Sequence, residues 1–285
     1  MSRCTFIADT PNAPSMKVSA KIGRAFYSIA LIVYGIQQFV YGDFRPVQLP
    51  AWQSHLPLLP VWAYLTGAVL IFVGGATLAG RGRIALLLTG GIFLFFFLFV
   101  HVPYEFFGEE NSSTHLALWV SALKELALAG GAFVMAGSYP ESEGAKDRSR
   151  PVRFLERIIP FGGIFFSITI ISFGITHFMY AEFVATLVPE WVPDHLFWTY
   201  FAAVTLIASG ICIVLKVRQG VVALLLCVML FIWVFTVHLP LTIKNPTAMR
   251  GNDLSSMFDA LAFCGTALVI SIKTLYIDLW EIAHD

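Results

Sequence analysis

The feature that most constrains this chain is a series of long apolar runs. A helix needs roughly 20 mostly apolar residues to cross the hydrocarbon core of a bilayer. Eight segments reach or approach that length: 23–41, 62–79, 84–100, 116–136, 161–180, 196–215, 221–237 and 254–272. Backbone polar groups in lipid must be bonded within the segment itself. We therefore expect an all-α membrane protein with eight transmembrane helices.

The composition agrees with a chain whose solvent is the lipid bilayer. Hydrophobic residues make up 58% of the 285 positions and charged residues only 13%, about half the charged fraction of a soluble domain. The net charge is zero, so charge indicates no nucleic-acid partner. The first sixteen residues are polar, and we expect no cleaved signal peptide there.

The positively charged residues gather in alternate connecting segments, which predicts the orientation. One set of segments holds Arg3, Lys17, Lys21, Arg24, Arg81, Arg83, Lys146, Arg148, Arg150, Arg153, Arg157, Lys216, Arg218 and Lys273. The opposite loops hold only Arg45, Lys244 and Arg250. The positive-inside rule makes the first set cytoplasmic, with both termini on that side. The opposite rim is acidic, which either attracts cations or is only a solvated loop face. It contains Asp43, Glu105, Glu109, Glu110, Glu182, Glu190, Asp194 and Asp253.

The sequence repeats itself along almost its whole length. Residues 34–41 match 173–180, and Val100-His101-Val102-Pro103 matches Val237-His238-Leu239-Pro240. In the fourth helices, Lys124 matches Asp259. We expect a tail at 1–22, a four-helix unit at 23–137, a cytoplasmic linker at 138–157, a second unit at 158–275 and a tail at 276–285. Four helices per copy is an even number, so the two bundles are parallel repeats. Inverted repeats, common in ion-coupled transporters, need an odd number.

The motifs of this unit resemble the DoxX family. They are Gly174-Ile-Thr-His177-Phe-Met-Tyr180 at the end of a first helix, Val188-Pro-Glu-Trp-Val-Pro193 in the following loop, and Leu123-Lys-Glu-Leu-Ala-Leu-Ala-Gly-Gly-Ala132 in a fourth helix. Each copy keeps only part of the pattern, since Gln38 replaces His177 and Asp259-Ala260 replaces the Lys-Glu pair. The resemblance implies a multi-pass protein of the bacterial inner membrane, associated in some members with quinone-linked oxidation. Function carried over in this way is analogy.

Three ionisable residues fall inside the fourth helices and form a candidate polar core. Lys124 and Glu125 lie about nine residues into their predicted helix, near mid-depth, with Asp259 at the matching depth of the second copy. Charged groups within a membrane are expensive and often functional. We predict that Lys124 and Asp259 come within ion-pair distance. An ion pair that only fixes the fold and a proton or substrate site are equally compatible with the pattern.

Three matched pairs are candidate ligand-binding residues: His101 with His238, Gln38 with His177, and Tyr41 with Tyr180. Each histidine of the first pair precedes a proline by two positions, so capping of a helix end explains them without a ligand. The functional alternative is a polar anchor for a quinone headgroup or a metal. The sequence predicts no metal site, and heme would require the two histidines to converge. Packing and an interfacial aromatic belt explain the tyrosines as well as a ligand pocket does.

The four cysteines, Cys4, Cys212, Cys227 and Cys264, form no C-x-x-C motif. We interpret them as small buried residues, because their spacing does not indicate two thiols in reach of one another. The chain also contains no P-loop, dinucleotide-binding glycine motif or nucleophile elbow.

The residues and the resemblance leave three functions open. The first is a redox-linked membrane subunit with a quinone pocket in the outer half, working with a redox partner protein. The second is a scaffold or assembly protein without chemistry of its own. The third is a small-molecule or proton-coupled transporter that uses Lys124, Glu125 and Asp259. The sequence identifies no substrate, and it leaves open whether the chain is an enzyme.

Overall fold

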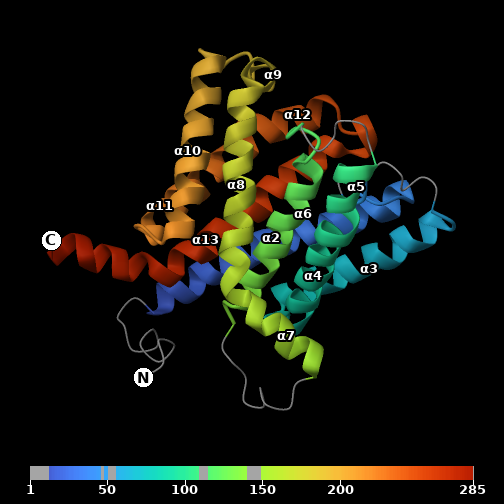
Figure 1. Cartoon of the computed structure of the whole chain (residues 1–285), viewed down its shortest axis with the longest axis horizontal. Coiled ribbons are helices and arrows are strands. Elements are labelled where there is room, and N and C mark those ends of the chain that lie inside the picture. The colour runs from blue at the N-terminus through green and yellow to red at the C-terminus, as the bar shows by residue number, and fades with distance from the viewer. Residues whose placement is uncertain (1–12, 46–47, 51–55, 109–114, 140–148, 285) are drawn as a thin grey trace.

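The computed structural model describes residues 13–45, 48–50, 56–108, 115–139 and 149–284 (Figure 1). The described part of the first half comprises α2 (Ala13–Tyr41), α3 (Leu59–Leu78), α4 (Arg83–Phe96), the π-helical turn η2 (Phe97–His101), α5 (Val102–Phe107) and α6 (Val120–Ala136). The second half begins with α7 (Arg150–Ile158), the 3-10 turn η5 (Ile159–Phe161), α8 (Gly162–Met179), α9 (Ala181–Ala185) and α10 (His195–Leu215). It ends with α11 (Gln219–Trp233), the π-helical turn η6 (Val234–His238), α12 (Leu239–Lys244), η7 (Ala248–Arg250) and α13 (Asn252–His284).

Six of the described helical segments are long and apolar enough to cross a membrane: 59–78, 83–107, 150–179, 195–215, 219–244 and 248–272. Many large apolar side chains on these helices are exposed, including Phe72, Phe99 and Leu225. Such a surface is unfavourable in water and suits lipid. The chain is therefore a multi-pass helical membrane protein. The other two predicted crossings coincide with α2, which carries Arg24, Gln37 and Gln38, and with α6, which has 17 residues.

The long helices form two rows of four. In one row the order of contact is α3, α2, α13 and α11, and in the other it is α10, α8, α6 and α4. The rows meet where α6 packs on α13. In Figure 1 the helices α2, α3 and α13 run obliquely, whereas α4, α6 and α8 run steeply. Each row therefore contains two helices from each half of the chain, so the halves interlock.

Glycine allows the closest approaches between the halves. A Cβ atom on Gly265 of α13 would lie 2.5 Å from the Gly23 carbonyl oxygen of α2. A Cβ atom on Gly130 of α6 would lie 2.5 Å from the Gly162 carbonyl oxygen of α8. Small residues at helix contacts let backbones approach and pack closely in membranes. These two contacts hold each fourth helix against the first helix of the other half.

The helix formed by the third apolar run of each half is longer than the sequence predicts. We expected Pro103 and Pro240 to stop their helices near Val100 and Val237, but the helical segments continue to Phe107 and Lys244. A proline lacks the N–H group that a regular helical turn needs. The π-helical turns η2 and η6 end two residues before the two prolines, and such turns accommodate an altered bonding register within a helix. His101 and His238 therefore lie inside continuous helices and do not cap helix ends.

Other boundaries also differ from the predictions. Part of the predicted linker is helical, because α7 begins at Arg150 and leads through η5 into α8. Residues 116–119 form turns, so α6 begins at Val120 rather than at residue 116. At the other end of the chain α13 extends to His284, through most of the predicted tail. These shifts change the positions of the candidate residues along their helices.

Candidate functional site

The candidate residues gather near one end of the helix rows, which we call the distal end. It comprises the turn after α2, α5, α9 and α12, and it is opposite to the end where α2 starts. At the distal end Gly42 adopts a φ of +60° and its N–H donates to the Gln38 carbonyl oxygen at 3.0 Å. Glycine is favoured in this left-handed conformation at a helix end. The turn directs the following residues, including Arg45, back into the protein.

Arg45 is the centre of a buried ionic cluster, which consists of Arg45, Glu125, Asp259, Lys124 and Tyr34. The Arg45 Nη2 atom donates to Glu125 Oε1 at 2.6 Å, and both side chains are fully buried. Arg45 Nη1 lies 3.5 Å from Asp259 Oδ1. The guanidinium carbon also lies 4.3 Å from the centroid of the Tyr34 ring, a cation–π contact. Arg45 therefore links α2, α6 and α13.

Asp259 joins the second cation of the ionic cluster to the first. Lys124 Nζ lies 3.1 Å from Asp259 Oδ2, within the ion-pair distance that the sequence predicts. The Tyr34 hydroxyl donates to Asp259 Oδ1 at 2.5 Å, and Lys124 Nζ donates to the Ser256 hydroxyl at 3.1 Å. The ionic cluster therefore contains two cations and two carboxylates, and its formal charges cancel.

Lys124 and Glu125 lie nearer to the start of their helix than the sequence predicts. Lys124 and Glu125 are the fifth and sixth residues of α6, because that helix starts at Val120. Asp259 is the eighth residue of α13. At a rise of about 1.5 Å per residue, these positions lie roughly 6–11 Å from the helix starts. The sequence placed about nine helical residues before Lys124 because it counted residues 116–119 as part of the helix, whereas four residues of α6 precede Lys124 in the structure.

Electrostatics keeps Arg45 charged in spite of its burial. Burial alone favours the neutral form, but the negative charges of Glu125 and Asp259 outweigh that effect and raise the pKa of Arg45 above its usual value. The sequence counted Arg45 among the residues of the opposite loops, and the structure keeps it outside the helices but buries its side chain. Asp43 and Glu105, assigned to the acidic rim, are also buried. Asp43 forms an ion pair with Arg250.

A second polar group lies next to the ionic cluster and contains two of the predicted ligand-binding residues. We call it the glutamine network: Gln38, Gln48, Thr66 and His101. Gln38 Nε2 donates to Gln48 Oε1 at 2.5 Å, and the Thr66 hydroxyl donates to Gln38 Oε1 at 2.6 Å. His101 Nε2 lies 3.1 Å from the Gln48 carbonyl oxygen. Gln48 also donates from its backbone N–H to the Arg45 carbonyl oxygen at 3.1 Å, which connects the network to the ionic cluster.

The glutamine network borders a groove between α3 and α4. The groove is lined by Gln48, Trp62, Leu65, Thr66, Val69, Leu70, Thr89, Ile92, Phe93 and Phe96. Most of these residues are apolar, and Trp62, Leu65, Val69 and Ile92 are among the exposed side chains of the lipid-facing surface. Its volume is about 210 Å³. The groove therefore offers an apolar surface that is open to lipid, with Gln48 and Thr66 as its polar end.

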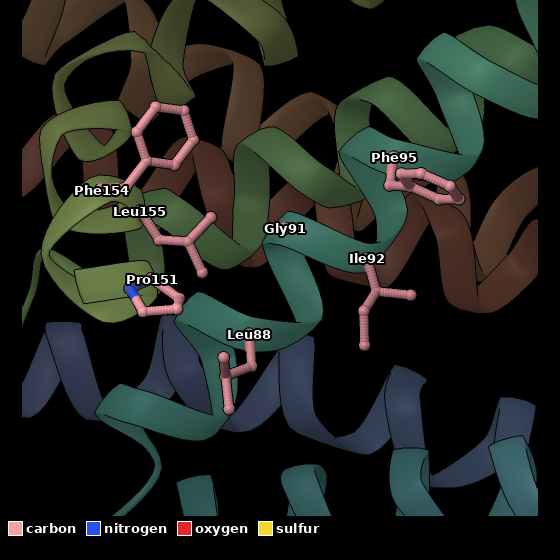
Figure 2. Close-up of a pocket in the computed structure, with 7 residues that line it drawn as sticks. All are labelled: Leu88, Gly91, Ile92, Phe95, Pro151, Phe154 and Leu155. Atoms are coloured by element: carbon pink, nitrogen blue, oxygen red, sulfur yellow. The ribbon is translucent and has the colours of Figure 1, made fainter. Parts of the chain in front are cut away.

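A second groove lies on the other side of α4 and has a different character. Leu88, Gly91, Ile92 and Phe95 of α4 line it together with Pro151, Phe154 and Leu155 of α7, and Figure 2 shows Leu155 pointing toward Gly91. Leu155 packs on Gly91, where an added Cβ would meet its Cδ2 atom at 2.9 Å. All of the lining side chains are apolar. This surface suits acyl chains but provides no group for chemistry.

The candidate residues of the second half do not form a copy of the glutamine network. His177 Nδ1 lies 2.7 Å from the Phe173 carbonyl oxygen, one helical turn back. His238 lies near Lys124, Asp259 and His177, whereas His101 contacts Gln48. Tyr41 and Tyr180 are half-buried at their helix ends. Within the described ranges, no group of three or more His, Cys, Asp or Glu residues could hold a metal ion.

The arrangement has two chemical properties. The ionic cluster is enclosed and internally paired, so a transport path through Lys124, Glu125 and Asp259 would require it to open. The groove beside the glutamine network is accessible from lipid and can accept a ring-shaped group with hydrogen-bonding atoms. Comparison with known proteins adds no identity, since no family model, no curated protein and no solved structure matches this chain.

Proposed function

We propose that this chain is a DoxX-like, redox-linked membrane protein that binds a quinone in the groove between α3 and α4. The observation that carries the proposal is the position of Gln48 and Thr66 in a groove whose other lining residues, apart from Thr89, are apolar or aromatic. A quinone has a ring with two carbonyl acceptors and an isoprenoid tail. The amide of Gln48 is a donor for one quinone carbonyl beside apolar side chains that suit the tail. The Thr66 hydroxyl, which donates to Gln38 Oε1 at 2.6 Å, would exchange that bond for one to the quinone.

The size of the groove also suits a headgroup. Pockets that enclose drug-sized ligands have volumes of about 300–1,000 Å³, whereas this groove measures about 210 Å³. It can therefore take a ring but not a whole isoprenoid lipid. A tail attached to the ring would remain along α3 and α4 among the exposed side chains, such as Leu65 and Val69.

The ionic cluster would have a positioning role in this function. Arg45 is held by Glu125 and Asp259, and its carbonyl oxygen accepts the hydrogen bond from the backbone of Gln48. The two residues belong to the same turn, so the buried ion pairs fix the place of Gln48 at the groove. No described side chain of the groove carries electrons. The chain would therefore supply the quinone site of an assembly whose partner protein supplies the electrons.

The experiment is photolabelling of the full chain in nanodiscs with an azido-benzoquinone that carries a short alkyl tail. We expect label on α3 and α4, and we expect an excess of unlabelled decyl-benzoquinone to remove it. Val69→Trp fills the groove at a position that already faces lipid, and it should reduce the label at least fivefold. Thr205→Trp is the matched control, since Thr205 holds the corresponding position on α10 in the register of the sequence repeat.

The proposal fails if the label spreads evenly over the lipid-facing helices, if competitor does not remove it, or if Val69→Trp and Thr205→Trp behave alike. An alkyl azide without the ring distinguishes recognition of the headgroup from general lipid contact. Absence of any competed label would favour the second candidate function, a scaffold. That alternative is supported by the enclosure of Arg45 and Glu125, whose fully buried side chains pair with one another.

A further inference from the structure

Two cysteines from different helices meet in the second half of the chain. Cys227 Sγ of α11 lies 3.4 Å from Cys264 Sγ of α13. Cys264 Sγ also lies 3.3 Å from the Cys227 carbonyl oxygen, to which its thiol donates. Both side chains are buried. The spacing in the sequence did not indicate this contact, because the two residues are 37 positions apart.

The thiol pair lies deep in the protein but close to lipid. Cys227 is the ninth residue of α11 and Cys264 the thirteenth of α13, or about 12 and 18 Å from the helix starts. Cys227 lies between Leu225 and Val228, which are 62% and 49% exposed on the apolar surface. A molecule dissolved in the bilayer therefore comes within one helical turn of Cys227, whereas a charged oxidant in water does not.

The geometry suits formation of a bond between the two sulfur atoms. A disulfide has an S–S distance of about 2.05 Å, so the sulfur atoms must approach by about 1.4 Å from their present separation. Rotation of the two side chains can supply a movement of that size without separating α11 from α13. Chance packing of two small residues would explain their burial, but it does not require the sulfur atoms to face one another.

We propose that Cys227 and Cys264 form a redox-active dithiol that is reversibly oxidised by quinone in the bilayer. Both S–H bonds break and one S–S bond forms. The two electrons and two protons pass to the quinone, whose carbonyl oxygens become the hydroxyls of a quinol. The thiol pair is oxidised and the quinone is reduced, and a dithiol reductant reverses the change. The α3–α4 groove is not involved, so this proposal does not rest on the proposed quinone site there.

The test uses the full chain in nanodiscs and tetramethyl-benzoquinone, whose ring positions are all blocked against addition of a thiol. After treatment the protein is denatured, free thiols are alkylated with maleimide, and peptides are mapped by mass spectrometry. We expect a cross-link between the Cys227 and Cys264 peptides, with one quinol formed per chain and full reversal by dithiothreitol. Ferricyanide, which remains in water, should oxidise this pair at least tenfold more slowly.

Cys227→Ser and Cys264→Ser should each abolish quinol formation, while Cys212→Ser leaves it unchanged. Cys212 is the matched control because it is a free cysteine of the neighbouring helix α10 in the same half. The proposal is overturned if both thiols remain open to alkylation after quinone treatment. It is equally overturned if either serine variant still forms quinol, or if the cross-link joins Cys212 instead. Val69→Trp separates the two proposals, since it should remove photolabel from α3 and α4 without slowing oxidation of the thiol pair.

Discussion

Replacement of Arg45 by methionine tests whether the ionic cluster depends on its central cation. Methionine keeps the apolar stem and removes the charge. Asp259 keeps its contact with Lys124 at 3.1 Å, but Glu125 loses the ion pair that it makes with Arg45 at 2.6 Å. The formal charge of the ionic cluster changes from zero to minus one, in a place where both side chains were fully buried. We expect a large loss of stability with one identified cause, the uncompensated carboxylate of Glu125.

The magnitude follows from the geometry. At 2.6 Å and an effective dielectric constant of about 20, the attraction between Arg45 and Glu125 is ~6 kcal/mol. Part of it is offset by the cost of desolvating two charges, and removal of one partner from a buried pair typically costs about 3–5 kcal/mol. For a chain of this size we expect the melting temperature to fall by on the order of 10 °C.

The assay is thermal unfolding in mild detergent, followed by tryptophan fluorescence at a constant scan rate. The double variant Arg45→Met/Glu125→Gln restores neutrality and should recover at least half of the loss. Lys244→Met, which removes an exposed cation at the end of α12, should change stability by less than about 0.5 kcal/mol. A double variant that is no more stable than Arg45→Met would refute the reasoning, because the loss would then not come from Glu125.

Two further predictions concern the contacts around the ionic cluster and between the halves. Tyr34→Phe removes the hydroxyl that donates to Asp259 at 2.5 Å, and it should destabilise the protein by about 1.5–3 kcal/mol in the same assay, as for bonds to charged groups. Tyr27→Phe, whose hydroxyl donates to the neutral Leu128 carbonyl oxygen at 2.6 Å, should cost only about 1 kcal/mol. Gly130→Ala should lower the melting temperature, because its Cβ would meet the Gly162 carbonyl oxygen at 2.5 Å. Gly75→Ala has open space and should be neutral or stabilising by up to about 1 kcal/mol, so equal effects of the two alanines would contradict the packing between α6 and α8.

The contact between Lys124 and Asp259 could be predicted from the sequence, for a physical reason. Charged groups in apolar helices need partners, and the register of the repeat places these two at matching positions of opposite charge. The register also aligns the His-x-Pro sequences of the two halves, which lie at the ends of η2 and η6. What the pattern did not reveal was the helical continuity through those prolines, because the π-helical turns leave no residue signature of their own.

Arg45 could not be placed from the sequence because its burial depends on a turn. An arginine four residues after a predicted helix is normally exposed to solvent, and the sequence analysis assigned Arg45 only to a loop. The left-handed conformation at Gly42 turns the chain. Arg45 then lies against Glu125 of α6 and Asp259 of α13. The contact between Cys227 and Cys264 could not be predicted for a related reason. It depends on the packing and relative rotation of α11 and α13, which sequence spacing does not encode.

The two halves differ in ways that packing alone does not require. In the register of the repeat, Gln48 and Thr66 correspond to Leu187 and Ala202, while Arg45 corresponds to Val184. The second half makes the same pattern of helix contacts with these apolar residues in place. Burial of polar and charged groups carries a cost that apolar side chains in the same places avoid. A valine, a leucine and an alanine occupy these places in the second half, so the helix contacts do not by themselves require the arginine, glutamine and threonine of the first half.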